Sequence, residues 1–390
     1  MNESLRSRLN RVQSAALVVG VAGLALCVLG AFVSGRQQFF ASYLFGYLFW
    51  LNLSLGCFGI AMLQHLTGGR WGFVIRRFLE AGFMIIPLMA LLFVPLLFGL
   101  QDLYAWARPT EVAVDPVLQN RANYLNPTGF IIRAVVVFAI WSSMAWCLRK
   151  WSLQQDQTTD PAPTRRLRTL SGPGMVIYPL TATFAYIDWA MSLEPDWYST
   201  MFPVIIVIGQ FLSTIAFSIV MLGLLRKEAP FAEVVSTTHF HHLGNLLLTF
   251  VMFWTYISFG QFLIIWSGNL PQEIVWYVHR IADGWKWIVV LLALFHFFVP
   301  FFLLLFRANK QRVPVLMTIA GFVFFVRILD VFWMVAPSFH PTGIRIHWLD
   351  VAAPLGVGGI WIAAFIYHLK RRDLLPRHDP RLQPVIAHAR

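Results

Sequence analysis

The sequence predicts an all-α, polytopic membrane protein with about ten transmembrane helices, and three observations predict it. Hydrophobic residues make up 58% of the 390 residues and charged residues only 12%, about half the charged share of a soluble domain. Apolar runs of about twenty residues, the length that crosses a bilayer core, recur along the chain. Lys and Arg gather in the short segments between those runs. We therefore interpret the net charge of +12 as a determinant of topology rather than of binding to nucleic acid.

Hydropathy divides this single integral domain, residues 1–390, into ten expected spans. The first follows Arg6, Arg8 and Arg11, and its apolar run exceeds the core of a usual signal peptide, so we favour a retained helix over a cleaved signal. Glycine and proline mark several of the breaks between later spans. The expected spans are residues 14–32, 40–66, 79–100, 127–148, 174–193, 200–225, 243–267, 284–306, 313–336 and 351–369.

The basic residues also orient the helices. Of the 30 Lys and Arg residues, 22 lie in the N-terminal tail (1–13), the C-terminal tail (370–390) and the alternate loops between them, whereas the opposite loops hold five. Loops rich in Lys and Arg stay on the cytoplasmic side of a membrane. The sequence therefore predicts that both termini are cytoplasmic.

Two loops are longer than the others. Residues 101–126 face outside and carry several aromatic residues and prolines, which suit either a docking surface for a partner or an interfacial cap. Residues 149–173 face the cytoplasm, and their polar run QQDQTTDPAPT is typical of a flexible linker. The three arginines that follow this run, at 165, 166 and 168, are expected to anchor the topology and contact anionic lipid.

The stretch 236–290 combines the parts that a membrane-embedded polar site needs. His239, His241 and His242 open it, and an apolar run follows that is long enough to span the membrane. A Gly-Asn-Leu-Pro break at 268–271 then stops the helix, and a short segment with Trp and Tyr suits the membrane interface. The histidines are expected to form an interfacial cluster or a cytoplasmic entrance for protons.

Five charged residues inside the expected spans are candidates for a polar site. They come from four helices, and the predicted orientation places all of them towards the outer face; they are Arg133, Asp188, Lys286, Arg327 and Asp330. A charge inside the bilayer is costly, which makes each a candidate for function. The alternative for each is a local ion pair, such as Arg327 with Asp330 at i, i+3, or a side chain that reaches the interface.

Asp188 is the strongest of these candidates. It lies in the segment AYIDWAMSLEPDWYST, with Tyr186 and Glu194 close by. A carboxylate among aromatic side chains near an aqueous mouth is suited to accept protons from a bound quinol. The candidate proton path or quinone pocket therefore comprises Asp188, Glu194, Arg327, Asp330, Lys286, Arg133, Tyr186, Gln261 and His296. For Gln261 we favour a simpler role, hydrogen bonding between helices.

The sequence disfavours redox cofactors and metals in this chain. Only His296 lies in the middle of a span, whereas a bis-histidine haem needs two histidines at matching depth. Cys27, Cys57 and Cys147 are far apart in apolar runs, without a CxxC pair, so no iron–sulfur or c-type haem site is expected. The histidines at 239–242 have no carboxylate or cysteine pattern beside them that would indicate a metal site.

Three segments resemble a known family. The run FVMFWTYISFGQFLIIWSGNLPQEIVWYVHR, residues 250–280, resembles a segment of the F subunit of bacterial alternative complex III, a quinol:cytochrome c oxidoreductase. TATFAYIDWAMSLEPDWYSTMF (181–202) and HLTGGRWGFVIRRFLEA (65–81) are similar to further segments of that family. The resemblance extends over nearly the whole chain and implies an NrfD-like fold, a pair of four-helix bundles with peripheral helices.

The resemblance also implies a place for the chain in an assembly. It implies a multi-pass subunit of the bacterial cytoplasmic membrane, beside a second NrfD-like subunit, a multihaem cytochrome c and an iron–sulfur subunit. Haem c and the iron–sulfur clusters would then belong to those partners, with lipid around this chain. A structural role, proton conduction or binding of a quinone would remain for the chain itself, and it implies no catalytic residue.

A secondary transporter that works alone is the alternative. Such transporters place polar residues near the membrane midplane and use paired interrupted helices. Here the charges are expected towards one face, and only one Gly/Pro break, at 268–271, is conspicuous. We therefore favour the subunit of a respiratory complex.

Overall fold

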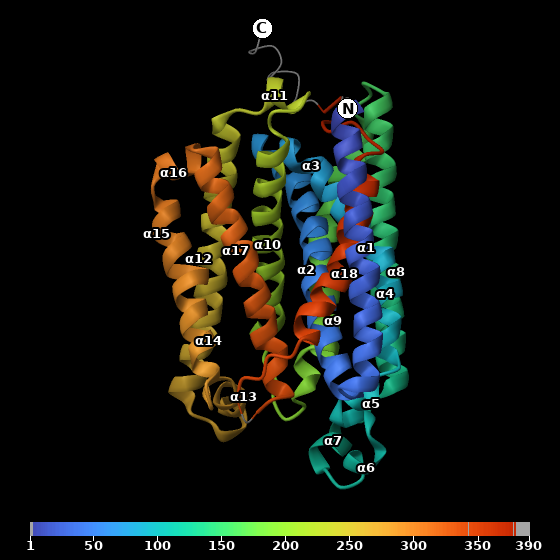
Figure 1. Ribbon diagram of the computed structural model, residues 1–390, viewed down its shortest axis with the longest axis vertical. Helices are drawn as coiled ribbons and strands as arrows, with labels where there is room; N and C mark the ends of the chain where they lie inside the picture. The colour runs from blue at the N-terminus through green and yellow to red at the C-terminus, as the bar shows by residue number, and fades with distance from the viewer. Residues whose placement is uncertain (1–2, 342, 377, 380–390) are drawn as a thin grey trace.

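The computed structural model describes residues 3–341, 343–376 and 378–379, and this part of the chain is helical without any strand. The long helices stand side by side along one axis (Figure 1). They are α1 (Glu3–Val33), α2 (Arg36–Thr67), α3 (Arg70–Phe83), α4 (Ile86–Leu97), α8 (Pro127–Gln157), α9 (Ala162–Trp189), α10 (Met201–Leu225), α12 (Thr237–Gly268), α14 (Trp285–Leu292), α15 (Val299–Leu305), α17 (Val313–Val335) and α18 (Leu349–Leu369).

Short helical pieces connect them. A π-helical turn, η3 (Ala293–Phe298), joins α14 to α15 within one continuous span. The remaining pieces are α5 (Leu100–Leu103), η1 (Ala105–Ala107), α6 (Pro109–Val112), α7 (Pro116–Arg121), η2 (Met191–Leu193), α11 (Phe231–Val234), α13 (Pro271–Ile281), α16 (Arg307–Gln311) and η4 (Ala336–Ser338).

Nine helical segments in the described residues are long and apolar enough to cross a membrane, as expected of a polytopic membrane protein. They correspond to nine of the ten expected spans. The remaining expected span, 174–193, falls in α9, which is not among the nine. Yet α9 runs antiparallel to α8 over the same depth. Gln155 bonds Thr164 at one end of the pair, and Arg133 pairs with Asp188 at the other.

The start of α1 and the end of α18 lie at the same end of the bundle, which we call the termini end. Lys370, just after α18, donates a 2.7 Å hydrogen bond to Asn10 of α1. Between these points the two helices are in close contact, since a Cβ on Gly23 would lie 2.6 Å from the Cα of Gly356. The short helices α5, α6 and α7 lie at the opposite end, which we call the loop end (Figure 1).

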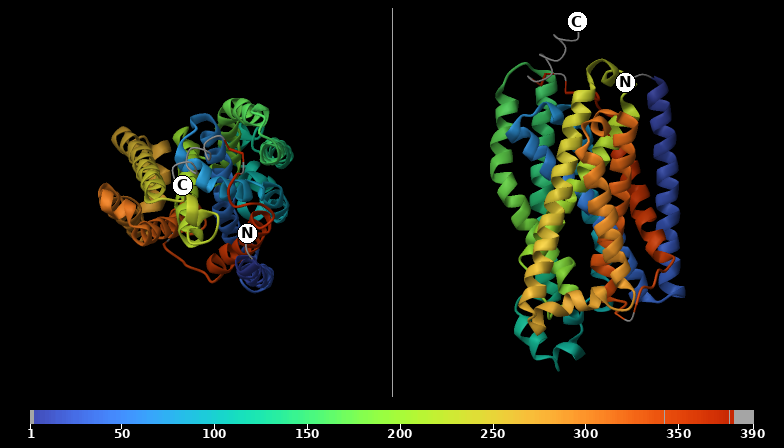
Figure 2. Two further views of the ribbon diagram at one scale, coloured as in Figure 1. Left: turned by 90° about the horizontal axis from the view of Figure 1, so that it is seen from above. Right: turned by 90° about the vertical axis from the view of Figure 1, so that its left-hand side faces the viewer.

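The helices form two groups with α2 at the centre (Figure 2). One group contains α2, α3–α4, α8 and α9, and the other contains α10, α12, α14–α15 and α17; α10 packs against α2, and α1 and α18 lie at the periphery. Within the most apolar stretch of α2, 94% of residues are buried, against 22% for α1. The core therefore lies along α2 and α10.

Both long loops are more ordered than a linker. The expected loop at 149–173 is mostly helix, because α8 continues to Gln157 and the Asp160 carboxylate accepts the Ala162 N–H at the start of α9. The expected loop at 101–126 folds into a cap over the end of α9. In this cap, the buried Tyr104 hydroxyl donates to the Trp189 carbonyl at 2.9 Å, and Trp106 donates to Ser192 at 3.0 Å.

Candidate functional site

An ion pair between α8 and α9 lies in the loop half of the first helix group. The Arg133 Nε and Nη2 atoms donate to the two Asp188 carboxylate oxygens at 2.6 and 3.2 Å. Asp188 is only 1% exposed, and the Arg133 guanidinium stacks 3.9 Å from the centre of the Tyr124 ring. Two parallel charge-assisted bonds are the strong form of this interaction. Asp188 is therefore a buried carboxylate, as expected, with Arg133 as its counter-ion.

A second ion pair lies inside α17. Arg327 and Asp330 pair across one turn, and both side chains are 1% exposed. The Arg327 guanidinium lies against Gly209 of α10, where a Cβ would stand 2.2 Å from its Nη2 atom. Arg327 Nε and Asp330 Oδ1 make no hydrogen bond to another described residue. The pair is thus buried with spare hydrogen-bonding capacity.

A third cluster ties the loop end together. Glu194 accepts from Arg280 Nη1 at 2.5 Å and from the Ser338 hydroxyl at 2.7 Å, with His279 Nδ1 at 3.2 Å. Arg280 also donates to the Met334 carbonyl at 2.9 Å. The cluster joins α13 to η4 and to the segment after η2, so Glu194 has a role in holding the loop end together that its sequence neighbours do not predict.

The same contacts set the protonation of this cluster. Burial alone would raise the pKa of Glu194, but Arg280, His279 and Ser338 outweigh it and lower that pKa to about 2. The hydrogen bond to Glu194 in turn raises the pKa of His279. Glu194 is therefore a fixed anion near neutral pH.

A chain of neutral polar side chains crosses from α9 through α2 to α10. The Tyr186 hydroxyl donates to Asn52 Oδ1, which also accepts from Gln210 Nε2 at 2.9 Å, and the Tyr178 hydroxyl donates to Gln210 Oε1. All four residues are at least 97% buried. Of these four residues, only Tyr186 was predicted as a candidate. Asn52 and Gln210 could have been predicted too, because an Asn or a Gln inside an apolar run often forms hydrogen bonds between helices.

Three of the predicted residues do not join these contacts. Lys286 is exposed, with its ammonium group 5.7 Å from the Trp287 ring, so it does not belong to the buried set. Gln261 is buried, but its amide makes no hydrogen bond to another described residue, contrary to the expected role between helices. His296 lies in η3, fully buried against Trp254 at 4.1 Å, and neither ring nitrogen has a described partner.

The histidines at the start of α12 have different roles. The His239 ring accepts from the Ser236 N–H and completes the cap of α12, which is a structural function. His241 and His242 are partly exposed, with ring centres 6.1 Å apart. In the described residues, no three His, Cys, Asp or Glu side chains are grouped to hold a metal ion. The proposed entrance for protons at this position stays a prediction.

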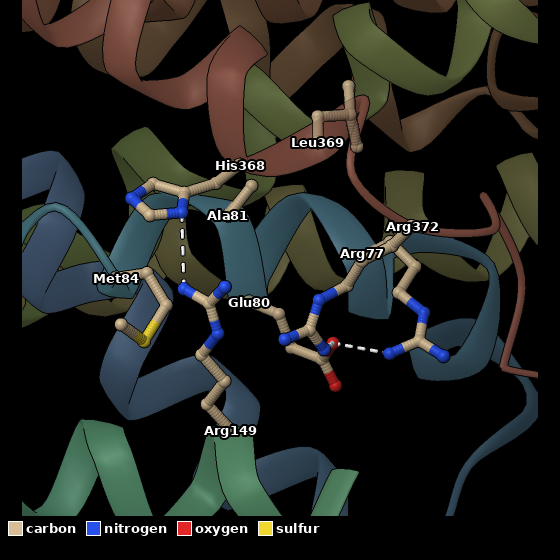
Figure 3. Close-up of a pocket in the computed structure, with 8 residues that line it drawn as sticks. All are labelled: Arg77, Glu80, Ala81, Met84, Arg149, His368, Leu369 and Arg372. Carbon is tan, nitrogen blue, oxygen red and sulfur yellow. Dashed lines mark hydrogen bonds and ion pairs between the residues drawn. The ribbon is translucent and has the colours of Figure 1, made fainter. Parts of the chain in front are cut away.

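A buried charge network that the sequence did not predict lies at the termini end. Glu80 of α3 accepts from Arg76 at 2.9 Å and from Arg77 at 2.5 Å, and Ser152 of α8 donates to the same carboxylate. Arg372, after α18, lies 3.6 Å from Glu80 (Figure 3). Arg76 and Arg77 were counted only as loop charges, because hydropathy placed them before the third span, and Glu80 at the start of that span was not considered.

A cavity of about 280 Å³ opens at the loop end beside the Arg133–Asp188 pair. Its walls include Tyr124, Ile187, Met191 and Trp197. The Trp197 indole nitrogen is buried without a described hydrogen-bond partner, and the buried Tyr124 hydroxyl lies near the Asp188 carboxylate. An apolar cavity with few polar groups suits a small, lipid-soluble ligand with hydrogen-bonding oxygens.

Chemically, the loop half offers buried carboxylates, which can accept and release protons, held by arginine guanidinium groups, which stay charged. A scan against models of protein families and a search among curated proteins both return no match.

Proposed function

We propose that the chain is an integral membrane subunit of a quinol:electron-acceptor oxidoreductase of the alternative complex III type, where it contributes structure and a path for protons. The observation that carries the proposal is the series of buried polar contacts from the loop half to the middle of the bundle. Asp188, which pairs with Arg133, lies two positions after Tyr186 in α9, and Tyr186 begins the chain of hydrogen bonds through Asn52 to Gln210 and Tyr178.

The geometry of α10 links this chain to the second helix group. Gln210 follows Gly209, against which the Arg327 guanidinium lies. The polar groups from Asp188 to Asp330 therefore lie on four helices that pack against one another in turn, namely α9, α2, α10 and α17. Ionisable groups inside a membrane protein characteristically mark such paths. The two helix groups with two peripheral helices also agree with the NrfD-like pair of bundles that the resemblance implies.

The proposal includes the surroundings of the chain. The subunit lies in a bacterial cytoplasmic membrane with both termini in the cytoplasm. It packs beside a second NrfD-like subunit, and the electrons pass through the haem c and iron–sulfur clusters of partner subunits. A quinone at the cavity beside Tyr124 is a second candidate function, favoured by the apolar walls and the buried Tyr124 hydroxyl.

The first experiment is purification of the tagged chain from its native membranes in a mild detergent. A large assembly with c-type haem absorbance and a second NrfD-like polypeptide is the expected result. A colourless chain that purifies alone, under conditions that preserve such complexes, would overturn the proposal and favour the stand-alone transporter.

The role in proton transfer is tested by Asp188→Asn in the intact complex. We expect assembly to persist, while quinol-dependent turnover or proton release falls about tenfold or more, because one relay group is removed. The matched control is Asp196→Asn, since Asp196 is exposed and lies nearby. Unchanged turnover and proton yield in the Asp188 variant would remove Asp188 from the path.

A further inference from the structure

A cavity of about 550 Å³ opens at the termini end, far from the proposed proton path. It lies between α1, α8 and the segment that follows α18, and its walls include Arg6, Leu153 and residues 370–373. Beneath it lies the smaller pocket of Figure 3, lined by Arg77, Arg149 and His368 among others. Arg372 lines both spaces and connects them.

Cations outnumber anions around these two spaces. The lining residues and their ion-pair partners include seven basic side chains and four carboxylates, namely Arg6, Arg76, Arg77, Arg149, Lys370, Arg371 and Arg372 against Glu80, Asp156, Asp373 and Asp379. Part of this positive charge has a defined position, because the side chains of Arg76 and Arg77 are at least 98% buried.

The carboxylates are mainly engaged by the buried arginines rather than by those at the opening. Arg77 donates to Asp156 at 2.5 Å as well as to Glu80, and Arg76 donates to Asp379 at 3.0 Å. In contrast, Arg372 Nη1 is buried, lies 3.6 Å from Glu80 and makes no hydrogen bond to a described residue. Its side chain is 10% exposed and lines both spaces, so its guanidinium places a positive charge in the wall.

Two further cations are placed at the opening. Arg6 of α1 is exposed and makes no ion pair with another described residue, and Arg371 is exposed with its guanidinium 4.2 Å from the Tyr367 ring. An anion in this cavity would therefore meet Arg6 and Arg371 from outside and Arg372 from inside.

The surface next to the cavity is apolar. Along the same helices, Val12 and Leu17 of α1 are 52% and 48% exposed, and Trp146 of α8 is 57% exposed. A ligand that fits both features has an anionic head and an apolar tail. Basic pockets between transmembrane helices near a membrane surface bind anionic lipid heads in this way.

We propose that the cavity between α1, α8 and the end of α18 binds the phosphate of an anionic phospholipid through Arg6, Arg371 and Arg372. Arg372 gives the site its fixed donor, while Arg6 and Arg371 provide charge at its mouth. The bound lipid would then hold the peripheral helix α1 against α8 and α18, independently of any role in proton transfer.

Native mass spectrometry of the full purified chain, or of its complex, tests this site. The protein is loaded with phosphatidylglycerol or with phosphatidylcholine, and the retained lipids are counted. We expect phosphatidylglycerol to be retained about tenfold better than phosphatidylcholine. The double variant Arg6→Gln with Arg371→Gln should lose about tenfold of that retention, as expected for two surface cations.

A matched control removes the same charge elsewhere at the same end. Arg307→Gln with Arg312→Gln changes two exposed arginines at the two ends of α16, and it should keep phosphatidylglycerol within about twofold of the wild type. Equal loss in both double variants would show unspecific attraction and overturn the proposal. If the cavity variant fails to fold, equal retention of the two lipids by the wild type overturns it.

Inorganic phosphate separates the two sources of a phosphate group. Phosphate added at millimolar concentration should leave phosphatidylglycerol in place, because the apolar tail contributes to lipid binding. Complete displacement of the lipid, with phosphate itself retained, would identify a site for free phosphate and overturn the lipid assignment.

Discussion

Two regions of the bundle differ in how their buried polar residues are paired: the contacts among α9, α2 and α10, and the contact between α12 and η3. In the first group and at its border with α10, the side chains of Asn52, Tyr186, Gln210 and Tyr178 satisfy one another in one chain of hydrogen bonds. In the second group, Gln261 and His296 are just as buried, yet their polar atoms have no partner among the described residues. The difference teaches that burial alone does not reveal what a polar residue contributes; its partners do.

The energetic consequence follows from this contrast. Removing one member of a satisfied pair leaves its partner unsatisfied and costs about 1–3 kcal/mol for each stranded group. Removing a polar group that already lacks a partner strands nothing. Substitutions in the two regions should therefore change the free energy of unfolding by different amounts, and even in opposite directions.

The largest effect is expected at the centre of the satisfied chain. Asn52→Leu strands both the Tyr186 hydroxyl and the Gln210 amide, so we expect the free energy of unfolding to fall by about 3 kcal/mol. Denaturant-induced unfolding in detergent micelles measures this loss. A change below about 0.5 kcal/mol would mean that the chain of hydrogen bonds is not a stabilising feature of the first group.

The next effect concerns the packing of α10 against α17 within the second group. Gly209→Ala places a methyl group where the Arg327 guanidinium lies, at 2.2 Å from Nη2, and should cost about 2 kcal/mol by displacing that side chain. Gly260→Ala on α12 is the control, because a Cβ there meets nothing within 4 Å. It should be neutral or stabilise by up to about 1 kcal/mol. Similar unfolding midpoints for the two variants would contradict this packing.

A smaller effect of opposite sign is expected at His296. His296→Leu keeps a similar volume and removes two buried nitrogens that have no described partner, so stability should stay the same or rise by about 1 kcal/mol. The same unfolding assay applies. A loss larger than about 1 kcal/mol would reveal a partner for His296 and remove the contrast between the two groups.

The smallest effect is a dependence on pH at the loop end. The hydrogen bond to Glu194 raises the pKa of His279. The charged imidazole therefore stabilises the fold fully below the unfolded-state pKa of about 6.5. This stabilisation is lost as pH rises through the raised pKa of the folded state. The side chain is 42% exposed, so the contribution should be well under about 1 kcal/mol. His279→Ala should therefore lower the melting temperature slightly at pH 6 and hardly at pH 9.

The Glu194–Arg280 ion pair should persist over the whole range from pH 6 to pH 9. Its carboxyl has a pKa of about 2, below its ordinary value, so its contribution is complete above the unfolded pKa of about 4.3 and disappears only as pH falls towards the folded value. A melting temperature that falls equally at pH 6 and pH 9 in the His279 variant would indicate lost packing rather than lost charge.

Much of the arrangement was predictable because hydropathy is local. The nine confirmed spans follow from uninterrupted apolar runs, and the capped start of α8 at Asn126 and Pro127 follows from ordinary capping chemistry. The pairing of Arg327 with Asp330 could also be predicted, since residues at i and i+3 are neighbours on a helix surface. The full lengths of α8 and α9 could not be predicted, because the polar residues that extend these helices carry no hydropathy signal.

By itself, the sequence determined that this chain is an all-helical membrane protein and that Asp188 is a carboxylate confined among apolar residues. The tertiary structure alone decided which groups meet. It joined Arg133 to Asp188 over 55 positions, Arg280 to Glu194 over 86, and Arg76 to Asp379 over 303. The physical reason is that hydropathy acts through each residue's own burial, whereas an ion pair depends on the relative rotation and depth of two helices, and these are set by packing along the whole bundle.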